Sequence, residues 1–142
     1  MGMTDLEQRA WSRLTGEMAG GMHQYDYWED APEQIRQRYV DRELLELAAK
    51  AAGLRVKLWE GHSGTMCAID DDRHGRMWMP LHDDGNALRL AVKLSLFDGL
   101  ERRASEIAAQ VNYDMDPCEA TRRAIVRAAA EIQLQKERNE QN

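Results

Sequence analysis

Apolar residues recur at helical spacing in four stretches of the chain, and each stretch predicts an amphipathic helix. The four stretches are residues 4–18, 32–52, 83–94 and 116–132. Proline opens the second and the last, and glycines at 20, 21 and 53 follow the first two, as expected for helix starts and ends. Beyond Ile132 the sequence is polar apart from Leu134, and we expect residues 137–142 to form a flexible tail.

The apolar period changes to two between residues 54 and 69. Leu54 to Glu60 alternates apolar and polar residues, which predicts a half-buried strand. Thr65 to Ile69 predicts a second strand, and the glycine-bearing GHSG turn between them predicts an antiparallel hairpin. Arg76 to Met79 is a candidate third strand and Ser95 to Phe97 a further one.

The stretch from Leu100 to Tyr113 fits either a helix or a strand, because short apolar runs are not separated by periodicity. The element order predicts an α+β fold, a small antiparallel sheet flanked by helices (an α-β-α sandwich) with an extra N-terminal helix. We divide the chain into residues 1–31 (N-terminal helix and aromatic loop), 32–136 (the α+β domain) and 137–142 (the tail).

Composition restricts the class of partner. The chain has 142 residues, with 43% hydrophobic and 31% charged, which suits one globular domain. The formal net charge of −6 argues against a broad face for duplex nucleic acid. No apolar run is long enough to span a bilayer, and the N-terminus lacks the pattern of a signal peptide. Two cysteines provide no disulfide scaffold, so we expect a cytoplasmic protein.

Neither a metal site nor an enzyme is favoured. Histidines 62, 74 and 82 and Cys67 lie at irregular spacing, which is typical of surface histidines rather than of zinc ligands. Aspartates 70–72 are typical of a solvated acidic turn rather than of an acid–base pair. The chain also lacks the GxSxG, Walker, GxGxxG and HExxH motifs, so we expect no catalysis, metal or cofactor.

Two features suggest an anionic ligand instead. Arg122 and Arg123, with Arg127 one turn later, lie near the start of the last helix, where guanidinium groups and free backbone donors suit an anion. The alternative is a solvated helix face paired with acids such as Glu119 or Glu131. Trp78 and Asn86 flank the start of the helix at 83–94.

An indole near a helix start can stack on a base, and Asn86 can bond the edge of that base. The alternative for Trp78 is packing in the core. A third feature is the aromatic group of Tyr25, Tyr27 and Trp28, which lies in an acidic segment. It predicts either a recognition surface for a protein partner or a loop whose rings cover the edge of the core.

Two long motifs resemble a known group. The stretches MWMPLHDDGNALRLAVKL and EATRRAIVRAAAEI are similar to the paired hallmarks of small phage and prophage proteins of the phage ABA-sandwich domain group. The resemblance covers Asp41 to about Ile132, and Met79 stands where that group usually has asparagine. It implies helices around a small antiparallel sheet. A looser resemblance is to phage anti-defence sponges of the anti-Thoeris type, which sequester cyclic nucleotide or cyclic ADP-ribose signals.

The sequence therefore gives two functional hypotheses. In the first, a phage or prophage anti-defence protein in the bacterial cytoplasm sequesters a nucleotide-derived immune signal between Trp78, Asn86, Arg122 and Arg123, without catalysis. A pocket shared by subunits of a homo-oligomer would suit a domain of this size. In the second, the aromatic N-terminal surface of Tyr25, Tyr27 and Trp28 blocks a host protein.

Overall fold

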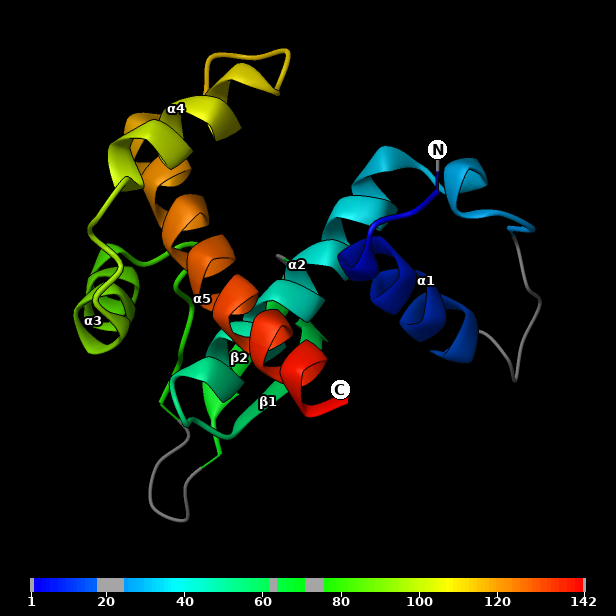
Figure 1. Ribbon diagram of the computed structural model, residues 1–142. Coiled ribbons are helices and arrows are strands. Elements are labelled where there is room, and N and C mark those ends of the chain that lie inside the picture. Colours follow the sequence, from blue (N-terminus) through cyan, green and yellow to red (C-terminus); the bar gives the residue numbers. More distant parts are fainter. Residues whose placement is uncertain (1, 18–24, 62–63, 71–75, 142) are drawn as a thin grey trace.

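The computed structural model describes residues 2–17, 25–61, 64–70 and 76–141. In this part of the chain the fold is α+β, a small antiparallel sheet flanked by helices with an additional N-terminal helix (Figure 1). The elements are α1 (Asp5–Glu17), a 3-10 turn η1 (Trp28–Asp30), α2 (Glu33–Ala51), β1 (Val56–Gly61), β2 (Gly64–Ile69), α3 (Asp84–Leu94), α4 (Leu100–Ala109) and α5 (Pro117–Gln141).

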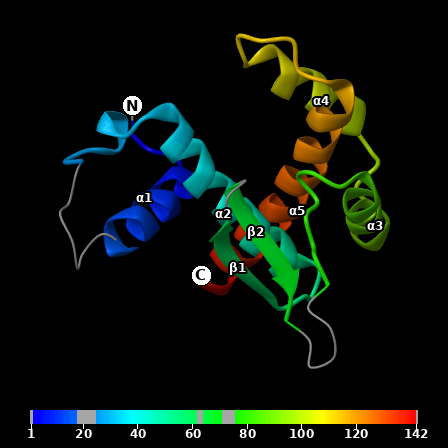
Figure 2. The same cartoon turned by 180° about the vertical axis from the view of Figure 1, so that it is seen from behind.

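The packing of α2 against α5 forms the centre of the molecule. Alanines occupy the contact, and Ala48 and Ala129 have no exposed surface, so the two backbones approach closely. Leu44 and Leu47 of α2 belong to the same core cluster as Leu90 of α3. In Figure 1, α3 and α4 flank the N-terminal half of α5, whereas α1 lies on the N-terminal half of α2. The hairpin lies against α2 on the side seen in Figure 2.

The hairpin has the predicted antiparallel pairing. Val56 pairs with Ile69 at one end and Gly61 with Gly64 at the other, while His62 and Ser63 lie outside the described residues. The expected third strand is reduced to a single bridge between Ala68 and Met77. Two backbone hydrogen bonds still fix this segment on β2: Ile69 N donates to Arg76 O at 2.8 Å, and Trp78 N to Cys67 O at 2.9 Å. They fix the positions of residues 76–78 relative to the hairpin.

The start of α3 agrees with the sequence prediction. Asp83 is its N-cap, and its Oδ1 atom accepts a hydrogen bond from Asn86 N at 2.9 Å. Ser95 ends the helix in the left-handed conformation, with φ of 56°, so residues 95–97 do not form the strand expected as a candidate. The ambiguous stretch from Leu100 begins with a helix, α4. Its apolar face packs on α5 through the buried Ile107.

The N-terminal segment docks on α2 through a second small core. Ala10 and Leu14 of α1 and Trp28 of η1 are buried there with Ile35 and Tyr39 of α2 packed around them. The glycines expected to end α1, residues 20 and 21, lie outside the described residues. The N-terminal helix therefore has its hydrophobic partner within its own chain.

The structure continues the last helix through residues 137–141, where the sequence led us to expect a flexible tail. Helix α5 runs to Gln141, well past the point where its apolar stripe ends. Its last turns are bound to α1 by charge: Arg138 Nη2 lies 2.7 Å from Asp5 Oδ2, and Arg9 pairs with Glu137. A segment without apolar residues gives no hydrophobic signal of docking, so the sequence pattern could not reveal this contact.

Candidate functional site

The structure does not bring the four predicted site residues into one cavity: Trp78 and Asn86 line one hollow, from which Arg122 and Arg123 are absent. Arg122 braces α5 to the start of α3: its Nε donates to the carbonyl oxygen of Leu81 at 3.0 Å and its Nη1 lies 2.7 Å from Asp84 Oδ1. Its guanidinium is thus used within the protein. For Arg122 the structure therefore shows pairing with an acid of the protein, which was the alternative to anion binding.

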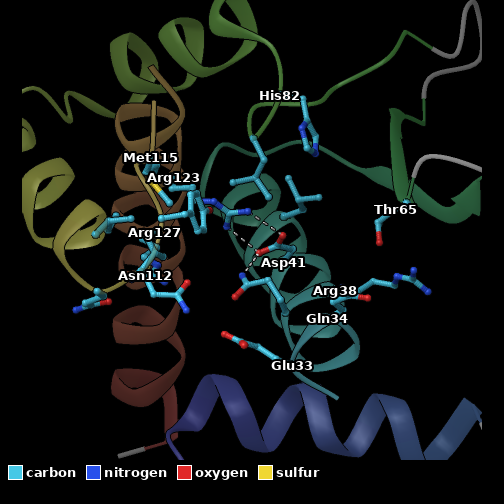
Figure 3. A pocket seen from close by; sticks show the side chains of 18 residues that line it. Glu33, Gln34, Arg38, Asp41, Thr65, His82, Asn112, Met115, Arg123 and Arg127 are labelled. Atoms are coloured by element: carbon cyan, nitrogen blue, oxygen red, sulfur yellow. Dashed lines mark hydrogen bonds and ion pairs between the residues drawn. The ribbon is translucent and has the colours of Figure 1, made fainter. Parts of the chain in front are cut away.

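Arg123 lines a cleft of about 600 Å³ between the N-terminal halves of α2 and α5 (Figure 3). We call it the α2–α5 cleft. Two nitrogens of Arg123 lie 3.1 and 3.3 Å from the two carboxylate oxygens of Asp41, and Glu119 is 3.6 Å away. Burial disfavours the charged guanidinium, but these acids outweigh it and raise the pKa of Arg123. This arginine is also committed to protein partners.

Trp78 and Asn86, by contrast, line one hollow. Trp78 is only 5% exposed and belongs to the main core cluster, so its ring cannot offer a face for stacking. Core packing, the alternative weighed for this tryptophan, is what the structure shows. Asn86 is half-buried on the first turn of α3, at the edge of the same hollow.

This hollow lies between α3 and the hairpin and has a volume of about 490 Å³. Three of its lining residues are basic, Arg76, Arg89 and Lys93, and none of its described lining residues is acidic. We call it the basic hollow. Within the described part of the chain these three side chains form no ion pair and no hydrogen bond. The described lining in full is Ala52, Leu54, Ile69, Arg76, Met77, Trp78, Asn86, Arg89, Leu90 and Lys93.

Helical geometry explains why the cations converge. Asn86, Arg89 and Lys93 lie at positions i, i+3 and i+7 of α3, so they share one face of the helix. Arg76 is added from the extended segment that is hydrogen-bonded to β2. These three cations were not among the site residues predicted from the sequence. The spacing of the α3 pair is visible in the sequence, but the approach of Arg76 depends on tertiary structure.

The aromatic N-terminal group is largely internal. Trp28 is 3% exposed, its Nε1 donates to Glu7 Oε2 at 2.9 Å, and its ring meets Trp11 edge-on at 6.3 Å. Tyr25 packs against the same small core, and Tyr27 is the exposed member at 68%. The structure therefore places two of the three rings where they cover the core.

The residues considered for metal binding are not assembled in the described part of the chain, where no group of three potential ligands occurs. His62 and His74 lie outside it. Cys67 is fully buried, and burial, with a smaller contribution from the charge of Glu46, raises the pKa of its thiol from 9.0 to about 12. Such a thiol is inert as a nucleophile at neutral pH.

This difference between the cysteines gives a first prediction. In native protein near pH 8, iodoacetamide should modify the exposed Cys118 and leave Cys67 intact, whereas unfolded protein should react at both thiols. Intact-mass spectrometry measures the number of modified thiols. Folding raises the pKa of Cys67, so the protonated thiol is favoured in the folded protein. Its contribution to the free energy of unfolding is complete below pH 9.0 and should be lost as the pH rises from 9.0 towards about 12. Equal labelling of both cysteines in native protein would show that Cys67 is not shielded.

No helix in the described residues combines the length and the apolar character needed to cross a membrane. Comparisons of the chain with protein-family models, with curated proteins and with solved structures found no match.

Proposed function

We propose that this protein binds a small, multiply charged anion of the nucleotide type in the basic hollow, and that it holds this ligand without converting it. The observation that carries the proposal is the charge of the hollow. Three basic side chains line it without an acid among the described residues, in a chain with a net charge of −6. Phosphate groups are the anions best matched to several converging cations.

Electrostatics supports a ligand there rather than simple solvation. Arg122, Arg123 and several other arginines pair with carboxylates, so acids are plentiful on this protein. The side chains of Arg76, Arg89 and Lys93 have no such partner among the described residues. Each charge-assisted hydrogen bond to a phosphate contributes about 1.5–3 kcal/mol. Two or three of them would give useful affinity even after the cost of ordering exposed side chains.

The hollow also has an apolar wall, which suits the base of a nucleotide. Leu54 and Ile69 of the hairpin region and the 42% exposed Met77 contribute to it. A methionine side chain adapts its shape to a flat ring and makes favourable sulfur–aromatic contacts. Asn86 provides an amide that can donate to and accept from the edge of a base. In this arrangement Met77 and Asn86 would contact the base, and stacking on Trp78 is not needed.

The described lining contains no carboxylate, histidine, cysteine or hydroxyl group to act as nucleophile or general base. This composition favours binding over turnover. Together with the resemblance to phage ABA-sandwich proteins and to anti-defence sponges, it supports the finer proposal that the ligand is a nucleotide-derived immune signal sequestered by a phage or prophage protein. Recovery of chemically intact ligand after the complex is denatured would support sequestration, and recovery of a cleaved product would exclude it.

The proposal is tested by isothermal titration calorimetry with ADP, ADP-ribose, cyclic nucleotides and, as the uncharged reference, adenosine. We expect at least one phosphate-bearing compound to bind and adenosine to bind far more weakly. The double variant Arg89→Gln with Lys93→Gln should lower that affinity by at least about tenfold, since each lost contact is charge-assisted. Affinity should also fall steeply as the salt concentration rises.

The matched control is Lys136→Gln, which removes an exposed lysine from the outer surface of α5 far along the chain from the hollow. It changes the net charge in the same direction but should leave the affinity unchanged. If the double variant binds as tightly as the parent protein, or if adenosine binds as well as ADP, the basic hollow is not the binding site.

A further inference from the structure

Arg127 is a cation of the α2–α5 cleft that has no ion pair among the residues that the structure describes. It lies one helical turn after Arg123 on α5, is only partly exposed, and lines the cleft with it. No hydrogen bond or ion pair joins it to any residue of the described chain. The other two arginines of the cleft have partners: Arg123 pairs with Asp41, and Arg38 Nε lies 3.7 Å from Glu60 Oε2.

The acids nearest to Arg127 are already engaged. Asp41 accepts from Arg123 through both carboxylate oxygens and from Gln37 Nε2 at 2.8 Å. Glu131, one turn further along α5, pairs with Arg103 at 2.9 Å. Among the described residues, these ion pairs therefore leave the guanidinium of Arg127 without a partner, in the wall of the α2–α5 cleft.

A partly buried guanidinium without a counterion is unfavourable, because an arginine cannot shed its charge to escape burial. Burial lowers the pKa of Arg127, and the neighbouring charge of Arg123 lowers it further, against the smaller influence of Asp41 and Glu131. An anion entering the cleft would relieve both effects. Residues that are suboptimal for stability in this way are often retained for binding.

We propose that the α2–α5 cleft binds a small organic acid that carries one carboxylate and a short apolar body, with Arg127 as the residue that holds the carboxylate. Guanidinium and carboxylate form two parallel hydrogen bonds, the strongest pairing open to Arg127. Amides of Gln34 and Asn112 line the same cavity (Figure 3) and can donate to a carboxylate oxygen. The amide of Gln110 also belongs to the lining.

The charge of the cleft favours a single negative charge. Among the arginines of the cleft, only Arg127 lacks an ion pair with the described residues, while Glu33 and Asp41 of α2 face the same cavity (Figure 3). A phosphate dianion would meet the repulsion of both carboxylates, whereas a monocarboxylate brings the smaller negative charge to the Arg127 guanidinium. The buried Leu45, Ile107 and Met115 provide an apolar floor for the body of the ligand. This site differs from the basic hollow in both position and preferred charge.

The test uses benzoate, acetate, inorganic phosphate and the neutral isostere benzamide, titrated into the full chain by calorimetry. We expect benzoate to bind more tightly than acetate, and benzamide to bind far more weakly than benzoate. Phosphate is compared in the Arg89→Gln, Lys93→Gln background, where the basic hollow has lost two cations, and there it should bind far more weakly than benzoate. Arg127→Gln should weaken benzoate at least about tenfold, and Arg127→Lys should weaken it less because the charge remains. Arg102→Gln is the control, since Arg102 is 81% exposed in its side chain and does not line the cleft.

Two further measurements separate this proposal from its alternatives. The variant Arg89→Gln with Lys93→Gln should lose affinity for the phosphate-bearing ligand but keep the parent affinity for benzoate, so the two sites succeed or fail independently. Without ligand, Arg127→Gln should melt at or above the temperature of the parent protein. A variant that melts several degrees lower would show Arg127 to be structural. Benzoate binding unaffected by Arg127→Gln, or phosphate binding as tightly as benzoate in the Arg89→Gln, Lys93→Gln background, would overturn the assignment.

Discussion

Trp78→Ala should lower the free energy of unfolding by about 3–5 kcal/mol, the cost of removing a large aromatic side chain from a packed core. Trp78 is 5% exposed and packs in the main cluster with residues of α2, α3 and α5. Domains of this size have a total stability of about 5–15 kcal/mol. The variant should therefore lose a large part of its stability, measured by urea unfolding followed by circular dichroism.

Trp59 on β1 provides the matched control. It is 44% exposed, so Trp59→Ala should cost about 1 kcal/mol or less. Trp78→Phe addresses function: it should keep the affinity for a phosphate-bearing ligand within a few-fold, because the indole is a wall of the hollow and not a stacking platform. Similar losses of stability for the two alanine variants would show that Trp78 is not a core residue of this fold.

Asp41→Asn should lower the free energy of unfolding by about 2–3 kcal/mol, because it leaves the Arg123 guanidinium without its main counterion. The side chains of this pair are 15% and 18% exposed, so solvent replaces the lost contact poorly. This loss of stability is smaller than that expected for breaking a fully buried ion pair, because Glu119 remains 3.6 Å from Arg123. Arg127, which forms no ion pair with the described residues, repels Arg123, and in the parent protein the charge of Asp41 offsets this repulsion.

A double-mutant cycle tests this explanation. Adding Arg123→Gln to Asp41→Asn removes the stranded charge and should restore part of the lost stability. The control is Asp114→Asn, at an exposed position without an ion pair or side-chain hydrogen bond in the described part of the chain, and it should be nearly neutral. Additive losses in the double variant would rule out a direct coupling between the two side chains.

The elements that the sequence predicted correctly are those with a strong local signal. The alternation in residues 54–60 and the helical spacing in residues 83–94 each depend on neighbours within a few residues, and the hairpin and α3 follow them. The apolar stripe of α2, with Gly53 after it at φ of 72°, is a further case. Local chemistry was sufficient for these elements.

The predictions that failed depend on partners distant in the chain. The extended segment at residues 76–79 forms a single bridge with β2, although its sequence suits a strand. The polar end of α5 stays helical where it meets charges of α1. Neither outcome can be predicted from a local stretch of sequence. For α5 the deciding contact joins Arg138 to Asp5, 133 residues away in the chain. For residues 76–79 the outcome depends on tertiary packing.

The same distinction applies to the candidate site. Trp78 and Asn86 do share a hollow, but the pairing of Arg122 with Asp84 and of Arg123 with Asp41 could not be read from the last helix alone. Those acids lie 38 and 82 residues away in the chain. A cluster of arginines in a sequence therefore indicates charge, and only the fold shows which of these charges remain unpaired.

The decisive experiment for the basic hollow is backbone amide chemical-shift mapping of the full chain with a phosphate-bearing nucleotide, using ADP as the first probe. We expect saturable shifts concentrated at Met77, Asn86, Arg89 and Lys93, and their loss when Arg89 and Lys93 are both changed to glutamine. Shifts that centre on α1 or on the exposed face around Tyr27, or that persist unchanged in the double variant, would place the ligand elsewhere and refute the hollow as its site.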